Sequence, residues 1–269
     1  MEHICYFLEI TLYPVAAILI CGFIVWACHR LFVRLLGHSG YKAVLASSII
    51  GTPIHELGHA IMCLLFGHKV LKLVLWQPSS SDGCLGYVRH TYNPRSLYQR
   101  MGNLFIGTGP IFSGMAVLSL ILFFSFPDTW SAYCASVIPL VKKGASIVDI
   151  FSAGLRMIPN MFAEFDSRSL SVWMRLPLVL VMLSVSLHIN LSPADIEGAL
   201  TALPLYLTIT LLVTVVTSVI GTAATGPVLA ALGVFNAFMM AMFAVVLAFA
   251  LAQVALAMLL RLILDLVRK

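Results

Sequence analysis

Long apolar runs, separated by short polar links, are the main pattern of this sequence. A membrane-spanning helix needs about 20 predominantly apolar residues, and most of the runs reach that length. Backbone polar groups inside a bilayer must be paired within the segment itself, so each run predicts a helix. The runs cover about residues 6–28, 41–66, 101–126, 176–191, 203–224 and 228–264. The pattern therefore predicts an all-α polytopic membrane protein with about six transmembrane helices.

The composition strengthens this prediction and excludes other classes. The chain is 61% hydrophobic and 10% charged, whereas a soluble domain has about 25% charged residues. We therefore expect an integral, multi-pass protein of the lipid bilayer, in the plasma (inner) membrane if the source is bacterial. The net charge of +5 fits Lys and Arg flanking the spans, and there is no soluble basic domain to bind nucleic acid. No basic region precedes the first apolar run, so a cleaved signal peptide is not expected.

Two connections between the apolar runs carry their own pattern. Residues 70–76 and 86–92 are rich in β-forming residues and flank a polar turn cluster, which predicts a small β-hairpin or sheet. This element is either a solvent loop or an edge strand that receives an extended substrate. Charged and apolar residues alternate through 127–175, which predicts an amphipathic helix at the membrane interface with a polar loop at 165–169. A turn is expected at Gly226–Pro227.

Three ionisable residues stand in the middle of the second apolar run. His55, Glu56 and His59 have the spacing His-Glu-x-x-His. Residues four apart share one face of a helix, so both imidazoles can reach a single metal ion. Glu56 stands beside them, where it can act on a metal-bound water. Ionisable groups at membrane depth are costly, so the three residues predict a functional metal site rather than two core histidines.

A catalytic zinc site needs a third protein ligand. Asp195 and Glu197 lie in a polar break between two apolar runs, and such breaks occur where they line a wet cavity. Ser192 and Pro193 predict a helix start there, which places Asp195 in the first turn and favours it over Glu197. The candidates weighed for this position are Asp195, Glu197, His188, His68 and His90.

Three motifs in this order resemble the site-2 protease family of intramembrane zinc metalloproteases. The first is His-Glu-Leu-Gly-His at 55–59, within an apolar helix. The second is Gly109–Pro110, followed by Gly114, which is similar to the Gly-Pro segment of that family. The third is the stretch 190–198, which looks like the family's Asn-x-x-Pro sequence leading to an Asp-Gly pair. The usual Leu-Asp-Gly falls on Ile-Glu-Gly here, so Glu197 stays an alternative third ligand.

The resemblance implies a zinc-dependent metalloendopeptidase that cleaves a membrane protein within or near the bilayer. His55, His59 and Asp195 would hold Zn²⁺, Glu56 would be the catalytic base, and Asn190 would hold the substrate backbone. The family fold implies three helices carrying these motifs, a small β element after the first, and a site nearer the cytoplasmic face. The expected organisation is a first transmembrane helix and link at 1–40, a metalloprotease core at 41–200, and C-terminal transmembrane helices at 201–269.

Two other functions remain open from the sequence. One is a non-proteolytic scaffold or chaperone-like protein that retains the metal site and binds partner transmembrane helices. The other is a transporter, which the lack of an inverted repeat disfavours. Because no long extramembrane insert is present, regulation is expected from the substrate or from a partner membrane chain. The basic 68–100 loop and the C-terminus favour the cytoplasm, although Arg30, Arg34 and Lys42 then face outward.

Overall fold

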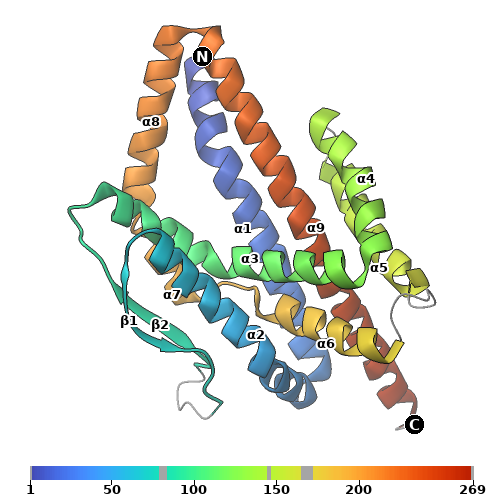
Figure 1. The fold of residues 1–269 in the computed structure, drawn as a ribbon. Coiled ribbons are helices and arrows are strands. Elements are labelled where there is room, and N and C mark those ends of the chain that lie inside the picture. The colour runs from blue at the N-terminus through green and yellow to red at the C-terminus, as the bar shows by residue number, and fades with distance from the viewer. Residues whose placement is uncertain (1, 79–83, 144–146, 165–171, 268–269) are drawn as a thin grey trace.

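The computed structural model describes residues 2–78, 84–143, 147–164 and 172–267. Figure 1 shows a helical protein with one small antiparallel sheet on its flank. The helices are α1 (Glu2–Leu36), α2 (His38–Leu65), α3 (Leu97–Ser125), α4 (Pro127–Lys143), α5 (Ile147–Glu164), α6 (Val172–His188), α7 (Pro193–Leu200), α8 (Leu203–Ile220) and α9 (Thr222–Val267). The strands are β1 (Lys69–Val74) and β2 (Tyr87–Thr91).

Four described helices are long and apolar enough to cross a membrane, namely α2, α3, α8 and residues 224–266 of α9. α6 and α7 pass the same test together, although the chain bends by 58° at the short break between them. If this bent pair is one span, it adds a fifth. The helical class, the small sheet and several apolar helices compatible with a membrane protein therefore agree with the sequence prediction. Among the described residues the number of such helices is four or five, so the expected six spans are not confirmed.

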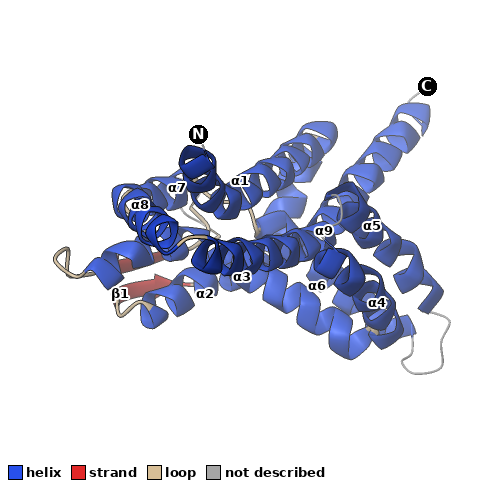
Figure 2. Ribbon diagram, turned by 90° about the horizontal axis from the view of Figure 1, so that it is seen from above, coloured by secondary structure: helices blue, strands red, loops and turns tan. Residues whose placement is uncertain are grey.

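The helices form two groups that share the long helix α9 (Figure 1). α1 and α8 pack against α9, and the N-terminus lies at the same end of the molecule as the α8–α9 junction. α2, α3 and α6 pack on one another, and the view from above shows the sheet beside α2 (Figure 2). The motif-bearing segments thus lie together, although they are separated in sequence.

Glycines with positive φ set two of the helix boundaries. Gly37 has φ 57° between α1 and α2, and Gly221 has φ 90° between α8 and α9. Side chains with a Cβ rarely adopt this conformation, so glycine is the residue that stops the helix there. The expected turn at Gly226–Pro227 was wrong, because both residues lie inside α9. Pro227 removes one backbone donor without ending the helix.

The segment between α3 and α6 holds two helices, so the single amphipathic helix expected there was wrong. α4 packs on α5, and α5 packs along α9. Tyr133, Met157 and Met161 are buried because they face other helices. The expected polar loop at 165–169 lies outside the described residues.

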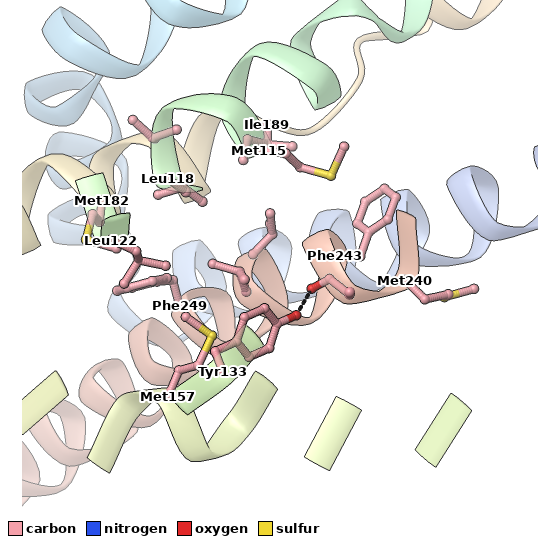
Figure 3. Close-up of a cluster of buried hydrophobic side chains, with 14 of the residues drawn as sticks. Met115, Leu118, Leu122, Tyr133, Met157, Met182, Ile189, Met240, Phe243 and Phe249 are labelled. Atoms are coloured by element: carbon pink, nitrogen blue, oxygen red, sulfur yellow. Dashed lines mark hydrogen bonds between the residues drawn. The ribbon is translucent and has the colours of Figure 1, made fainter. Parts of the chain in front are cut away.

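The main apolar core lies where α3, α4, α5, α6 and α9 meet (Figure 3). Its labelled side chains come from all five helices and include Leu118, Tyr133, Met157, Met182 and Phe243. The Tyr133 hydroxyl donates a hydrogen bond to the backbone carbonyl of Ala241. Helices in a bilayer are held together by van der Waals packing, so these interdigitated side chains hold α3 and α6 against α9.

The predicted hairpin is confirmed. β1 pairs antiparallel with β2, from Lys69 opposite Thr91 to Val74 opposite Tyr87. An irregularity lies between Val70 and Lys72. Just after β1, the Trp76 indole N–H donates to the Ser48 hydroxyl of α2 at 2.9 Å, which helps to hold the sheet against that helix.

Candidate metal centre

α2 places both histidines of the His-Glu-x-x-His motif at one point. His55 and His59 are one helical turn apart, and their Nε2 atoms lie 3.2 Å from each other. His59 and Glu56 are buried. The helical spacing predicted from sequence is therefore the spacing that the structure has.

The third group of the centre comes from α7. Asp195 Oδ1 lies 3.0 Å from His59 Nε2, and Asp195 Oδ2 lies 3.6 Å from His55 Nε2. The ligand atoms of the three residues all lie within 4.8 Å of one another, so the group can hold a metal ion. Glu197 is exposed and is not part of this group.

A capping box fixes the Asp195 carboxylate. The Ser192 hydroxyl accepts from the Asp195 backbone N–H at 3.2 Å, and Asp195 Oδ2 accepts from the Ser192 N–H at 2.7 Å. Pro193 occupies the first turn of α7, as the sequence predicted. The Asp195 side chain thus completes the capping box of α7 and also faces the imidazoles of His55 and His59. The role as a first-turn carboxylate and the role as a metal ligand are compatible.

Backbone carbonyls determine which ring nitrogens can bind metal. His55 Nδ1 lies 2.7 Å from the His188 carbonyl oxygen, and His59 Nδ1 lies 2.7 Å from that of Ile106. A carbonyl oxygen only accepts, so each Nδ1 must carry the proton and donate it. Each neutral ring then has its lone pair on Nε2, the atom that faces Asp195. Metal-binding histidines are commonly oriented by such a hydrogen bond, so the donor set fits a metal ion.

Glycines let the helices of the centre approach closely. A Cβ built on Gly58 of α2 would lie 2.6 Å from the Gly109 carbonyl oxygen of α3. A Cβ on Gly107 would overlap the backbone oxygen of Asp195. Small residues allow this close packing between helices in membranes. Gly107 therefore sets how closely α7, and with it Asp195, packs on α3.

The centre opens into a cavity of about 650 Å³. The lining includes the four residues of the centre, namely His55, Glu56, His59 and Asp195. Asn190 lines the same cavity. Another part of the lining is formed by β2 and by residues 84–86 before it. A Cβ on Gly86 would lie 2.8 Å from Glu56 Cγ, so the backbone of this segment rests on the Glu56 side chain. The cavity is therefore shared between helices and sheet.

The other candidate histidines have different places. His188 contributes its carbonyl to His55 and lines the cavity, but it does not join the three-residue group. His90 lies on β2, within the run for which β structure was predicted, and it also lines the cavity. His68 follows the end of α2, as predicted, and is buried there.

Sequence reasoning missed several polar residues of the cavity, among them Asn103 and Thr52. Asn103 donates its side-chain N–H to the Thr201 hydroxyl at 2.9 Å, which links α3 to the end of α7. Thr52 is buried, and its hydroxyl has no hydrogen-bond partner among the described residues. Thr52 precedes Glu56 by four residues, so helical spacing was a signal that could have identified it. Asn103 had no comparable signal.

Comparison with known proteins gave no match to a protein-family model, to a characterised protein or to a solved structure. The chemistry of the site is therefore inferred from its own atoms.

Proposed function

We propose that this protein is an intramembrane zinc metalloprotease, similar to site-2 proteases, that hydrolyses a peptide bond of a membrane-protein substrate. The observation that carries the proposal is the convergence of His55, His59 and Asp195 beside Glu56, at the wall of one cavity. Two histidines and a carboxylate form a common hydrolytic zinc set. Several apolar helices around the site support a substrate in the bilayer.

His55, His59 and Asp195 would hold the zinc through Nε2, Nε2 and a carboxylate oxygen. When bound, zinc supplies Lewis acidity and lowers the pKa of a water to about 7. Glu56 lies next to His55 in the helix and lines the same cavity. Its carboxylate oxygen accepts the proton of the attacking water and later delivers that proton to the leaving amine.

The substrate must be extended where it is cut, because the amides of a helix are already paired. β1 pairs with β2 along one edge, while β2 residues line the cavity. A substrate segment added to the other edge of β2 would use ordinary strand pairing. Asn190 lines the cavity close to the α6–α7 break and would bind the substrate backbone.

We also infer that α1 crosses the membrane. It is 35 residues long, which is more than enough to span a bilayer. With α6 and α7 taken as one broken span, this would give the six spans expected from the sequence. The apolar length of α1 supports this count.

The decisive experiment measures zinc content and cleavage together. Wild type, His59→Ala, Asp195→Asn and the control Glu197→Gln are purified in detergent and loaded with zinc. The probe is a fluorescently labelled, unfolded casein-type protein, together with a set of transmembrane peptides, and products are identified by mass spectrometry. We expect near-stoichiometric zinc and cleavage in wild type and in Glu197→Gln, with both lost in the other two variants. A wild-type protein that binds no zinc after reconstitution contradicts the proposal.

Zinc binding without cleavage of any probe would favour the second function instead. In that case the same cavity would belong to a non-proteolytic scaffold that binds partner transmembrane helices. The departure at Glu197 from the usual family motif is the observation that keeps this alternative in view.

A further inference from the structure

A second pair of histidines lies beside the cavity, and one of them, His90, belongs to the cavity lining. His68 follows α2 after a turn at Gly67, whose φ is 68°, and His90 lies on β2. His68 Nδ1 is 3.0 Å from His90 Nδ1. His90 lines the cavity, while neither histidine belongs to the group around Asp195. The metal-binding proposal therefore leaves this pair without a role.

Hydrogen bonding fixes the tautomer of both rings. His68 Nε2 lies 2.7 Å from the Gln99 carbonyl oxygen, which only accepts, so His68 Nε2 must carry a proton. In a neutral ring, His68 Nδ1 then bears a lone pair. His90 Nδ1 faces that lone pair and must donate its own proton to it. His90 is thereby left with a bare Nε2, which is the ring nitrogen remaining for the cavity.

Neighbouring side chains hold the His68 ring in this orientation. His68 is buried, and its ring stacks on Tyr92, with ring centroids 4.9 Å apart and an interplanar angle of 17°. The Gln99 side chain donates to the Gly67 carbonyl at 2.9 Å and accepts from the Asn93 N–H at 2.6 Å. These contacts join the end of α2, the end of β2 and the start of α3. The orientation of His68 is therefore set by three elements at once.

Burial favours the neutral form of His90. It lowers the pKa of His90, because the charged imidazolium loses solvation there. A neutral imidazole with its proton on Nδ1 offers a hydrogen-bond acceptor, not a donor, to the cavity. The ligand that suits this wall is a donor group. An unwound peptide segment supplies such donors, because its backbone N–H groups have lost their helical partners.

We propose that His90 is a substrate-contacting residue whose Nε2 accepts a hydrogen bond from a main-chain N–H of the extended substrate. His68 and Gln99 are positioning residues that fix the acceptor through the hydrogen-bond chain just described. The inference rests on the proposed peptidase function, and it adds a polar recognition point in the part of the cavity lining that β2 forms. It predicts that His90 affects substrate affinity rather than zinc binding.

The first test reads the tautomer and needs no catalysis. Zinc-loaded protein labelled with ¹⁵N-histidine is examined by solid-state NMR in bilayers, and the His90 signals are assigned by difference from His90→Gln. We expect His90 to be protonated on Nδ1 and bare on Nε2. In His68→Phe this preference should be lost, because the acceptor is gone. A wild-type His90 protonated on Nε2 overturns the inference, whatever the protease assays give.

The second test measures binding of a labelled, unfolded casein-type probe on a Glu56→Gln background, where cleavage is removed. One lost hydrogen bond should raise the Kd by about tenfold in His90→Phe. His90→Gln, which retains an acceptor, should restore most of the affinity. His38→Phe is the control, because His38 is exposed at the start of α2. Zinc content should be the same in all four proteins.

Three outcomes contradict the proposal. They are an unchanged Kd in His90→Phe, equal weakening in His90→Gln, and loss of zinc together with affinity. Failure of the peptidase function appears differently, as absent cleavage by a wild-type protein that still binds the probe through His90.

Discussion

Among the described residues, two clusters of ionisable side chains in this apolar helical protein are built in opposite ways. At the metal centre, three ligand atoms converge on one point at the wall of a cavity of about 650 Å³. In the second cluster, the Glu164 carboxylate accepts from the Thr129 N–H at 2.9 Å and from its hydroxyl at 2.7 Å. Arg175, which is fully buried, has Nη2 4.0 Å from Glu164 Oε1.

The difference teaches which buried charges point to a site. Glu164 closes the N-terminus of α4, and Arg175 joins that contact to α6, so their groups face one another. At the metal centre, backbone carbonyls occupy the Nδ1 atoms and leave both Nε2 lone pairs directed to a common point. Burial of an ionisable group alone therefore does not indicate a functional site. Lone pairs that converge on one point beside a cavity do indicate such a site.

The largest expected effect breaks the metal centre chemically while sparing its structure. Glu56→Gln removes the proton acceptor but keeps the shape of the side chain. We expect kcat for probe cleavage to fall by about 10³-fold, since positioned acid–base groups contribute about 10²–10⁴-fold. Zinc content and melting temperature should not change. The control is Glu197→Gln, an exposed carboxylate, and cleavage by Glu56→Gln at the wild-type rate would exclude the role as a base.

The converse change breaks the structural cluster. Glu164→Ala removes the carboxylate that caps α4 and faces Arg175. Loss of one member of a buried ion pair costs about 3–5 kcal/mol, so we expect a marked fall in thermal stability. Zinc bound per folded molecule should stay the same. Glu9→Ala, at an exposed position of α1, is the control, and Arg175→Met combined with Glu164→Ala should cost less than Glu164→Ala alone.

Local signals in the sequence were sufficient for the parts of the site that lie close together in the chain. The spacing of His55 and His59 on a helix, and the cap at Ser192, depend on residues within one turn. The hairpin was likewise visible from two β-rich runs around a turn cluster. Asp195 was favoured over Glu197 for a local reason, its place in the first turn of α7.

Features set by contacts between distant segments could not be predicted. The backbone carbonyls of Ile106 and His188 fix the tautomers of the two histidines from other helices. Every residue has a backbone carbonyl, so the sequence does not show which one makes this contact. α4 and α5 were taken for one interfacial helix, because only packing against α9 shows that their apolar faces belong to the core. The end of α8 is at Gly221 and not at Gly226–Pro227. The positive φ of Gly221 is a property of the folded backbone, so the sequence did not distinguish it from the other glycines.

A smaller effect is expected where packing, not chemistry, sets the metal geometry. Gly107→Ala adds a Cβ that would overlap the Asp195 backbone oxygen and approach Ala199 Cβ to 2.8 Å. α7 must then move away from α3, so we expect zinc affinity to fall by about 10–100-fold, as for other changes that misplace ligands. Competition with a chelator measures it. Gly198→Ala is the matched control, since nothing lies within 4 Å of its added Cβ.

The smallest effect separates the two roles of Asp195. Ser192→Ala removes the N-cap of α7, which should cost about 1 kcal/mol and loosen the carboxylate that faces the histidines. Ser96→Ala removes the N-cap of α3, where the Ser96 hydroxyl accepts from the Gln99 N–H, at a similar cost. Both variants should lower the melting temperature alike, but only Ser192→Ala should weaken zinc binding, by a few-fold. Equal zinc affinity in the two variants would mean that the capping box holds the helix without orienting the ligand, and that the close packing at Gly107 alone positions Asp195.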